Sequence, residues 1–126
     1  MAGCERGYLC TVCGQDVEEI SDSVLYLRYV MGEVEWDLLN RAPESHIRCH
    51  PILAQFIVDA SFEPMSCEGA FAKDQLDSDF VKSEEERVTI AYLRLRELAA
   101  TNLPIAEYPL PHVIARRESA PLTTEA

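Results

Sequence analysis

Two short clusters of cysteine and histidine constrain this chain more than any other feature of its sequence. Cys10 and Cys13 are three residues apart, and so are His46 and Cys49, which His50 follows directly. Cysteine and histidine side chains in pairs of this spacing are typical ligands of a tetrahedral Zn²⁺ ion. The two distant pairs therefore predict a chain that folds around one shared zinc ion.

The five residues offer one more ligand than a tetrahedral zinc ion takes. We favour Cys10, Cys13, His46 and Cys49, because both pairs then keep the same spacing. His50 is the alternative to His46. If His50 is not a ligand, we expect it to cap a helix or to form a hydrogen bond to a ligand. A closed site of three cysteines and one histidine is structural, and it contributes to folding rather than to chemistry.

The Cys10–Cys13 pair has a second interpretation, as a redox dithiol. A small reductase of disulfides or sulfur compounds would use these two thiols, with Cys67 as a partner thiol. The glycine and the acidic loop after Cys13 argue against the thioredoxin fold, in which this motif opens a helix. Outside that role, Cys4 and Cys67 are interpreted as ordinary thiols.

Charge and composition disfavour several classes of protein. The 126 residues include 22 acidic and 11 basic side chains, and the net charge of −11 argues against nucleic acid as a partner. No apolar segment approaches the roughly 20 residues of a membrane span, and the first residues lack a signal-peptide core. Five cysteines, an odd number, argue against a secreted disulfide framework. We therefore expect a cytoplasmic protein.

The apolar pattern predicts an α+β fold, with a small antiparallel sheet and two main helices. Residues 24–30 are rich in β-branched and aromatic side chains and predict a strand. Residues 34–36 are either its returning strand or, continued to residue 39, a helical turn. Helices are predicted from Pro51 to an end near residues 61–64, and from Ser83, or a turn earlier, to residue 99.

Both predicted helices have consequences for the fold and the site. Cys49 precedes Pro51 by two residues, and a helix dipole there favours an anionic thiolate. The second helix has an apolar stripe, which we interpret as the face that covers the sheet. The stripe consists of Val88, Ala91, Tyr92, Leu95, Leu98 and Ala99. Tyr26, Tyr29 and Trp36 are likewise interpreted as core residues.

The last quarter of the chain is rich in proline. Residues 105–114 are predicted to be extended, as an edge strand or as an arm on another subunit, because prolines 104, 109 and 111 oppose a continuing helix. Residues 119–126 are predicted to be a disordered tail, which leaves a single domain of residues 1–118. The apolar stripe and the extended arm together suggest a homodimer or a protein partner.

The order of these motifs resembles that of zinc-ribbon and treble-clef zinc-binding proteins, and the whole is similar to small zinc-binding proteins of actinobacteria. The likeness covers roughly residues 8 to 60 and depends on Cys10-x-x-Cys13-Gly14 and on His46-x-x-Cys49-His50-Pro51. It implies a knuckle, a β-hairpin and a helix on one zinc ion, with no particular activity. We expect an interaction or accessory module with a structural zinc site. The alternative is a small thiol- or zinc-dependent enzyme.

Overall fold

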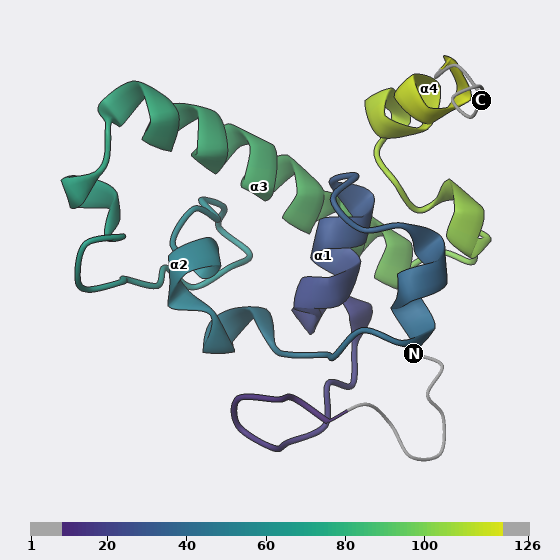
Figure 1. The fold of residues 1–126 in the computed structure, drawn as a ribbon, viewed down its shortest axis with the longest axis horizontal. Helices are drawn as coiled ribbons and strands as arrows, with labels where there is room; N and C mark the ends of the chain where they lie inside the picture. The colour runs from purple at the N-terminus through teal and green to yellow at the C-terminus, as the bar shows by residue number, and fades with distance from the viewer. Residues whose placement is uncertain (1–8, 120–126) are drawn as a thin grey trace.

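Helices and short turns make up the fold of the computed structural model, which describes residues 9–119. The α-helices are α1 (Val24–Val30), α2 (Pro51–Ala54), α3 (Ser78–Ala99) and α4 (Pro111–Ser119). Short 3-10 helices precede α1 or connect the α-helices: η2 (Ile20–Asp22) before α1, then η3 (Trp36–Asn40), η4 (Ile47–Cys49), η5 (Lys73–Gln75) and η6 (Ile105–Glu107). In Figure 1, α3 runs across the molecule above α1 and α2, and the loop that precedes α1 lies at the bottom of the view.

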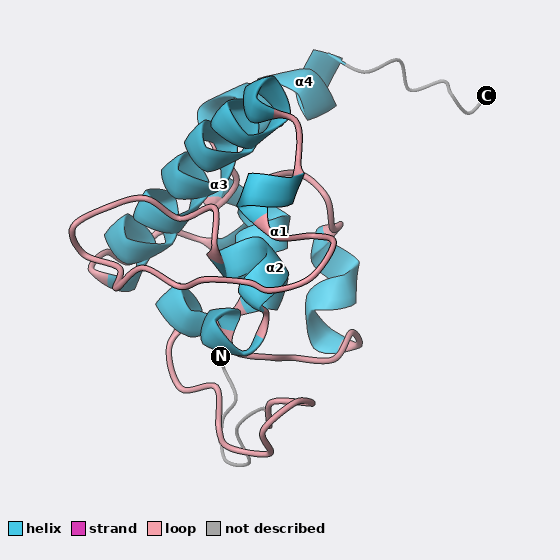
Figure 2. Cartoon of the chain, turned by 90° about the vertical axis from the view of Figure 1, so that its left-hand side faces the viewer, coloured by secondary structure: helices cyan, strands magenta, loops and turns pink. Residues whose placement is uncertain are grey.

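The predicted antiparallel sheet does not form in the described part of the chain. Backbone pairing between residues 9 and 119 is limited to isolated bridges, and Figure 2 draws only helices and loops there. The β-hairpin that the zinc-ribbon resemblance implies is missing for the same reason. The fold is helical, and the predicted α+β class is wrong.

The predicted strand at residues 24–30 is helix α1. Ser23 caps this helix, and its Oγ accepts a hydrogen bond from the N–H of Tyr26 at 3.0 Å. Six of the seven helical residues are buried. A helix buried on nearly all sides lacks the polar face by which a helix is recognised in a sequence. Packing in the core thus overrides the strand preference of the valine and tyrosine residues.

Helix α3 confirms its prediction and begins about a turn before Ser83. Asp77 caps it, since its carboxylate accepts hydrogen bonds from the N–H groups of Asp79 and Phe80 at 3.1 and 3.0 Å. The predicted stripe is buried at Val88, Ala91, Tyr92, Leu95 and Leu98, whereas Ala99 is exposed. This face packs against α1 and η2, so α3 covers a helix rather than a sheet.

Helix α2 is shorter than predicted, because it ends at Ala54 instead of near residues 61–64. The next residue, Gln55, is buried, and its side chain holds a distant segment. Its Nε2 donates to the carbonyl of Phe71 at 2.8 Å, and its Oε1 accepts from the N–H of Lys73 at 2.9 Å. Phe56 and Ile57 are buried just beyond the helix. The apolar pattern therefore continues after the helix has stopped.

The prediction that residues 105–114 are extended is also wrong, because this segment contains η6 and the start of α4. Pro111 occupies the first position of α4, where its missing N–H breaks no hydrogen bond. The segment packs on its own chain: the N–H of Leu110 donates to the carbonyl of Val30 at 3.1 Å. The hydroxyl of Tyr29 also donates to the carbonyl of Ile105 at 3.0 Å.

The core lies between α1, α3 and the segments that cover them. Tyr26 and Tyr29 belong to it, as predicted. The side chain of Trp36, residues 1–8 with Cys4, and residues 120–126 of the predicted tail lie outside the described part of the structure. Ser119, the first residue of that tail, is the last residue of α4.

Candidate metal centre

A tight turn carries the first pair of predicted ligands. The N–H of Gly14 donates to the carbonyl of Cys10 at 2.9 Å, and the N–H of Cys10 donates to the carbonyl of Gln15 at 2.8 Å. Gly14 has φ of 79°, a left-handed conformation that glycine adopts without strain. The turn therefore brings Cys13 back beside Cys10, as a zinc knuckle requires.

Residues 44–46 lie between this turn and the start of α1. On one side, the N–H of Thr11 donates to the carbonyl of Glu44 at 3.0 Å. On the other side, the N–H of Val24 donates to the carbonyl of Ser45 at 3.0 Å. These bonds place the second pair of predicted ligands, on and beside turn η4, against the first pair.

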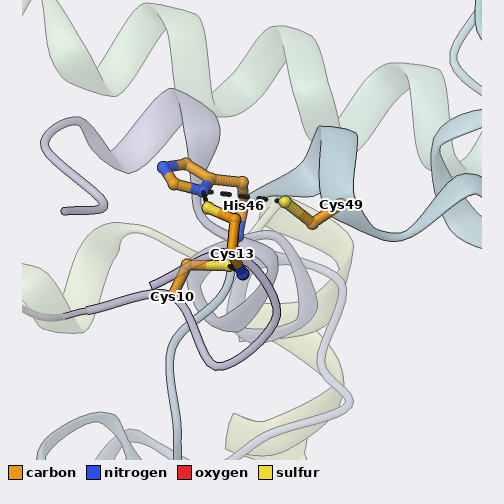
Figure 3. A group of neighbouring side chains, drawn as sticks. All are labelled: Cys10, Cys13, His46 and Cys49. Carbon is orange, nitrogen blue, oxygen red and sulfur yellow. Dashed lines mark hydrogen bonds between the residues drawn. The ribbon is translucent and has the colours of Figure 1, made fainter. Parts of the chain in front are cut away.

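Four of the five predicted ligands converge, and the side chains of Cys10, Cys13, His46 and Cys49 lie together in Figure 3. Their three sulfurs and one ring nitrogen lie within 4.8 Å of one another. A tetrahedral zinc ion needs about 3.8 Å between two sulfurs and about 3.5 Å between sulfur and nitrogen. His46 Nδ1 lies 3.4 Å from the sulfur of Cys13 and 3.9 Å from that of Cys49. The group thus fits a zinc ion with only small adjustments.

A backbone carbonyl orients the imidazole of His46. Its Nε2 lies 2.8 Å from the carbonyl oxygen of Asp16. A carbonyl only accepts, so Nε2 carries the proton and the lone pair of Nδ1 faces the sulfurs. Burial acts to lower the pKa of His46, but the bonds to Asp16 and to Cys10 outweigh burial and raise it. The ring therefore presents its ligating nitrogen toward the three cysteines.

The sulfur of Cys10 is buried and held by backbone groups. The side chain is only 2% exposed, and its Sγ accepts from the N–H groups of Val12, Cys13 and His46 at 3.3, 3.5 and 3.4 Å. Burial acts to raise the pKa of Cys10, but these N–H groups outweigh it and lower the pKa to about 5. The backbone N–H groups therefore favour the thiolate of Cys10, which is the form that binds metal.

The surroundings of Cys49 favour its protonated thiol. Burial, together with the neighbouring sulfurs of Cys10 and Cys13, raises the pKa of Cys49 to about 12 without a metal. The predicted helix dipole does not lower this pKa, because α2 is only four residues long. A zinc ion held by these residues would replace the repulsion between the sulfurs by attraction and would let all three cysteines ionise.

His50 is not among the four residues whose ligand atoms converge. It occupies the N-cap position of α2 without a side-chain hydrogen bond to the helix, so the predicted cap is not made. Its Nε2 is buried and has no hydrogen-bond partner within residues 9–119. Cys67 is also outside the group, and its sulfur donates to the carbonyl of Glu68 at 3.6 Å.

Glu44 and Ser23 form a buried hydrogen-bonded pair near the group, and the sequence did not assign them a role. Glu44 is only 4% exposed, and the hydroxyl of Ser23 donates to its carboxylate at 2.7 Å. Burial raises the pKa of Glu44, although hydrogen bonds from Ser23 and Ser45 oppose the rise. Acidic residues are common in this chain, so nothing in the sequence separates Glu44 from its exposed counterparts.

Comparisons with family models, with curated proteins and with solved structures found no match. None of the helices between residues 9 and 119 has both the length and the apolar character to cross a membrane. The feature that points to a function is the group of three cysteines and one histidine, which could hold a metal ion.

Proposed function

We propose that this protein is a zinc-binding module in which Cys10, Cys13, His46 and Cys49 hold one structural Zn²⁺ ion. The observation that carries the proposal is the convergence of four ligand atoms within 4.8 Å. Three thiolates and one imidazole form a soft donor set that suits zinc, whereas magnesium and calcium take oxygen ligands. The carbonyl of Asp16 keeps the proton of His46 on Nε2, which leaves Nδ1 able to bind the ion.

A structural role is supported by the number of ligands. Four protein ligands complete the tetrahedron, whereas a catalytic zinc ion keeps one position for water. The ion would join residues 10–13 to residues 46–49, so part of its binding free energy would stabilise the fold. We therefore assign the protein as an interaction or accessory module rather than as an enzyme.

The reductase alternative uses the same cysteines, and the environment of Cys10 weighs against it. A dithiol reductase attacks its substrate with an accessible thiolate. Cys10 has the low pKa of such a thiolate, but it is only 2% exposed and its sulfur contacts three N–H groups. This arrangement favours a metal ligand over a nucleophile.

Metal analysis of the purified protein tests the proposal. We expect about one zinc ion per chain, and after exchange with Co²⁺ the d–d absorption of a tetrahedral thiolate site. Cys10→Ser and Cys49→Ser should lose the zinc and unfold, whereas Cys67→Ser, which changes a cysteine outside the group, should retain both zinc and fold.

A folded wild-type protein that contains no zinc and takes up neither Zn²⁺ nor Co²⁺ would contradict the proposal. Rapid alkylation of Cys10 and Cys13, with cycling between dithiol and disulfide in the presence of a disulfide substrate, would support the reductase instead. Both measurements use the full chain, so they separate the two functions directly.

A further inference from the structure

The three cysteines of the proposed zinc centre differ in how freely their sulfurs can move. Cys10 is buried, and three backbone N–H groups of Val12, Cys13 and His46 point at its sulfur. Cys13 is exposed and Cys49 is half-buried. A reagent that arrives from solvent therefore meets Cys13 first.

The sulfurs of Cys13 and Cys49 both lie next to the ring of His46, and Figure 3 joins each of them to the ring by a dashed line. Nδ1 of His46 lies 3.4 Å from the sulfur of Cys13 and 3.9 Å from that of Cys49. The two sulfurs are within 4.8 Å of each other. A disulfide between them would require rotation about the side-chain bonds to bring the sulfurs to roughly 2.05 Å.

We infer that the zinc centre is also an oxidation site, at which a peroxide converts Cys13 and Cys49 to a disulfide, releases the zinc and leaves Cys10 reduced. This inference rests on the proposed zinc-binding function. The reaction is specific because one sulfur is exposed, a second is adjacent to it, and the third is held by the backbone.

The chemistry consumes one peroxide per disulfide. The Cys13 thiolate attacks one peroxide oxygen, so that an S–O bond forms, the O–O bond breaks and hydroxide leaves. The Cys49 thiolate then attacks the sulfur of the sulfenic acid, so that an S–S bond forms and a second hydroxide leaves. Two electrons pass from the sulfurs to the peroxide, and two protons convert the hydroxides to water. Zinc dissociates because only Cys10 and His46 remain as ligands.

Cys10 is the less favourable partner for Cys13, although the Cys-x-x-Cys spacing suggests it. A disulfide to Cys10 would draw its sulfur away from the N–H groups of Val12, Cys13 and His46. Those three N–H groups would then lose the sulfur that accepts their hydrogen bonds, and unpaired N–H groups in a partly buried place lower the stability of the fold. A disulfide between Cys13 and Cys49 leaves this arrangement intact.

The choice of partner decides what happens to the fold after zinc is lost. A Cys13–Cys49 disulfide joins the same two segments that zinc joins, and it restricts the unfolded chain by closing a long loop. A Cys10–Cys13 disulfide closes a short ring within one turn and joins nothing else. The oxidised protein should therefore remain folded without zinc.

Titration of the zinc-loaded, full-length protein with hydrogen peroxide tests the inference. Zinc release is followed with a colorimetric chelator, and the disulfide is mapped by mass spectrometry after thiol alkylation. We expect loss of the bound zinc, a Cys13–Cys49 disulfide and an alkylated Cys10. The oxidised protein should also melt at a higher temperature than reduced protein from which a chelator has removed zinc. Cys67→Ser should behave like the wild type.

The outcomes separate this inference from the proposed function. Protein that binds no zinc at the outset contradicts the proposed function. If the protein binds zinc, four results overturn the inference without affecting the proposed function. The protein keeps its metal under peroxide, or it forms a Cys10–Cys13 disulfide. Alternatively, Cys13 forms a disulfide with Cys67 or Cys4, or it gains only a sulfinic acid. Addition of a thiol reductant and zinc to the oxidised protein should restore the metal content. Failure to do so also counts against a Cys13–Cys49 disulfide.

Discussion

Backbone groups orient the ligands of the proposed zinc centre. The carbonyl of Asp16 holds the ring of His46, and three N–H groups hold the sulfur of Cys10. Both depend on the conformation of the turn at residues 10–16, because that turn supplies the carbonyl and two of the N–H groups. A change in the backbone of this turn should therefore affect metal affinity even when every ligand is kept.

Gly14→Ala tests this dependence. Gly14 has φ of 79°, and an added Cβ would meet no atom within 4 Å, so the cost is backbone strain of about 1 kcal/mol. Because the strain lies in the ligand turn, zinc affinity measured by competition with a chelator should fall by about fivefold. Gly69→Ala is the control, since Gly69 also has positive φ and open space but lies outside the site. Equal affinities for the two variants would disprove the dependence.

Glu44→Gln gives a pH-dependent prediction. Burial, opposed in part by hydrogen bonds from Ser23 and Ser45, raises the pKa of Glu44 in the folded protein. Between the unfolded value of 4.5 and this raised pKa the folded state binds more protons. The free energy of unfolding therefore falls as pH rises through that window. The amide side chain of the variant does not titrate, so the variant should gain stability relative to the wild type as pH rises through the window.

Denaturant unfolding of both zinc-loaded proteins at several pH values measures the Glu44 effect. Protonation of the zinc ligands affects both proteins alike and cancels in the difference. Glu18→Gln, at an exposed position, provides the baseline. The measured quantity is the stability gain of Glu44→Gln over the wild type. A gain that stays constant, or that shrinks as pH rises, would contradict the raised pKa of Glu44.

At the scale of the element, Ser23 connects helix α1 to the zinc centre. Its Oγ accepts from the N–H of Tyr26 and donates to the carboxylate of Glu44, and its backbone pairs with that of His46. Ser23→Ala should lower the free energy of unfolding by about 2–4 kcal/mol, because the helix loses its cap and a buried carboxylate loses its partner.

Asp77→Ala is the matched control for Ser23→Ala, because Asp77 caps α3 without contacting the zinc centre or a buried carboxylate. It should cost about 1 kcal/mol. Chemical denaturation of zinc-loaded proteins measures both effects. Equal losses for the two variants would show that the bond from Ser23 to Glu44 contributes little.

At the scale of the whole molecule, α3 supports a core that does not include the zinc centre. Leu95 is fully buried on the face that packs against α1, whereas Leu93 on the same helix is 40% exposed. Leu95→Ala should lower the free energy of unfolding by about 3 kcal/mol, because it removes packed atoms and leaves a cavity. Leu93→Ala should cost less than about 1 kcal/mol.

Thermal unfolding and metal analysis of the same samples check the Leu95 prediction. Both variants should still bind one zinc ion below their melting temperatures, because the ligand segments do not depend on the side chain of Leu95. Loss of zinc in folded Leu95→Ala protein would show instead that the core and the metal centre form one cooperative unit.

The sequence alone identified five candidate ligands, among them the four that converge, because ligand spacing depends on local chain geometry, and the same local rules placed α3. It did not reveal that residues 24–30 are a helix, since a segment buried on nearly all sides has the same composition as a buried strand. It also did not separate His46 from His50 or show the role of Glu44. Those choices depend on the carbonyl of Asp16 and on the burial of Glu44 and Ser45, which exist only once distant segments have packed together.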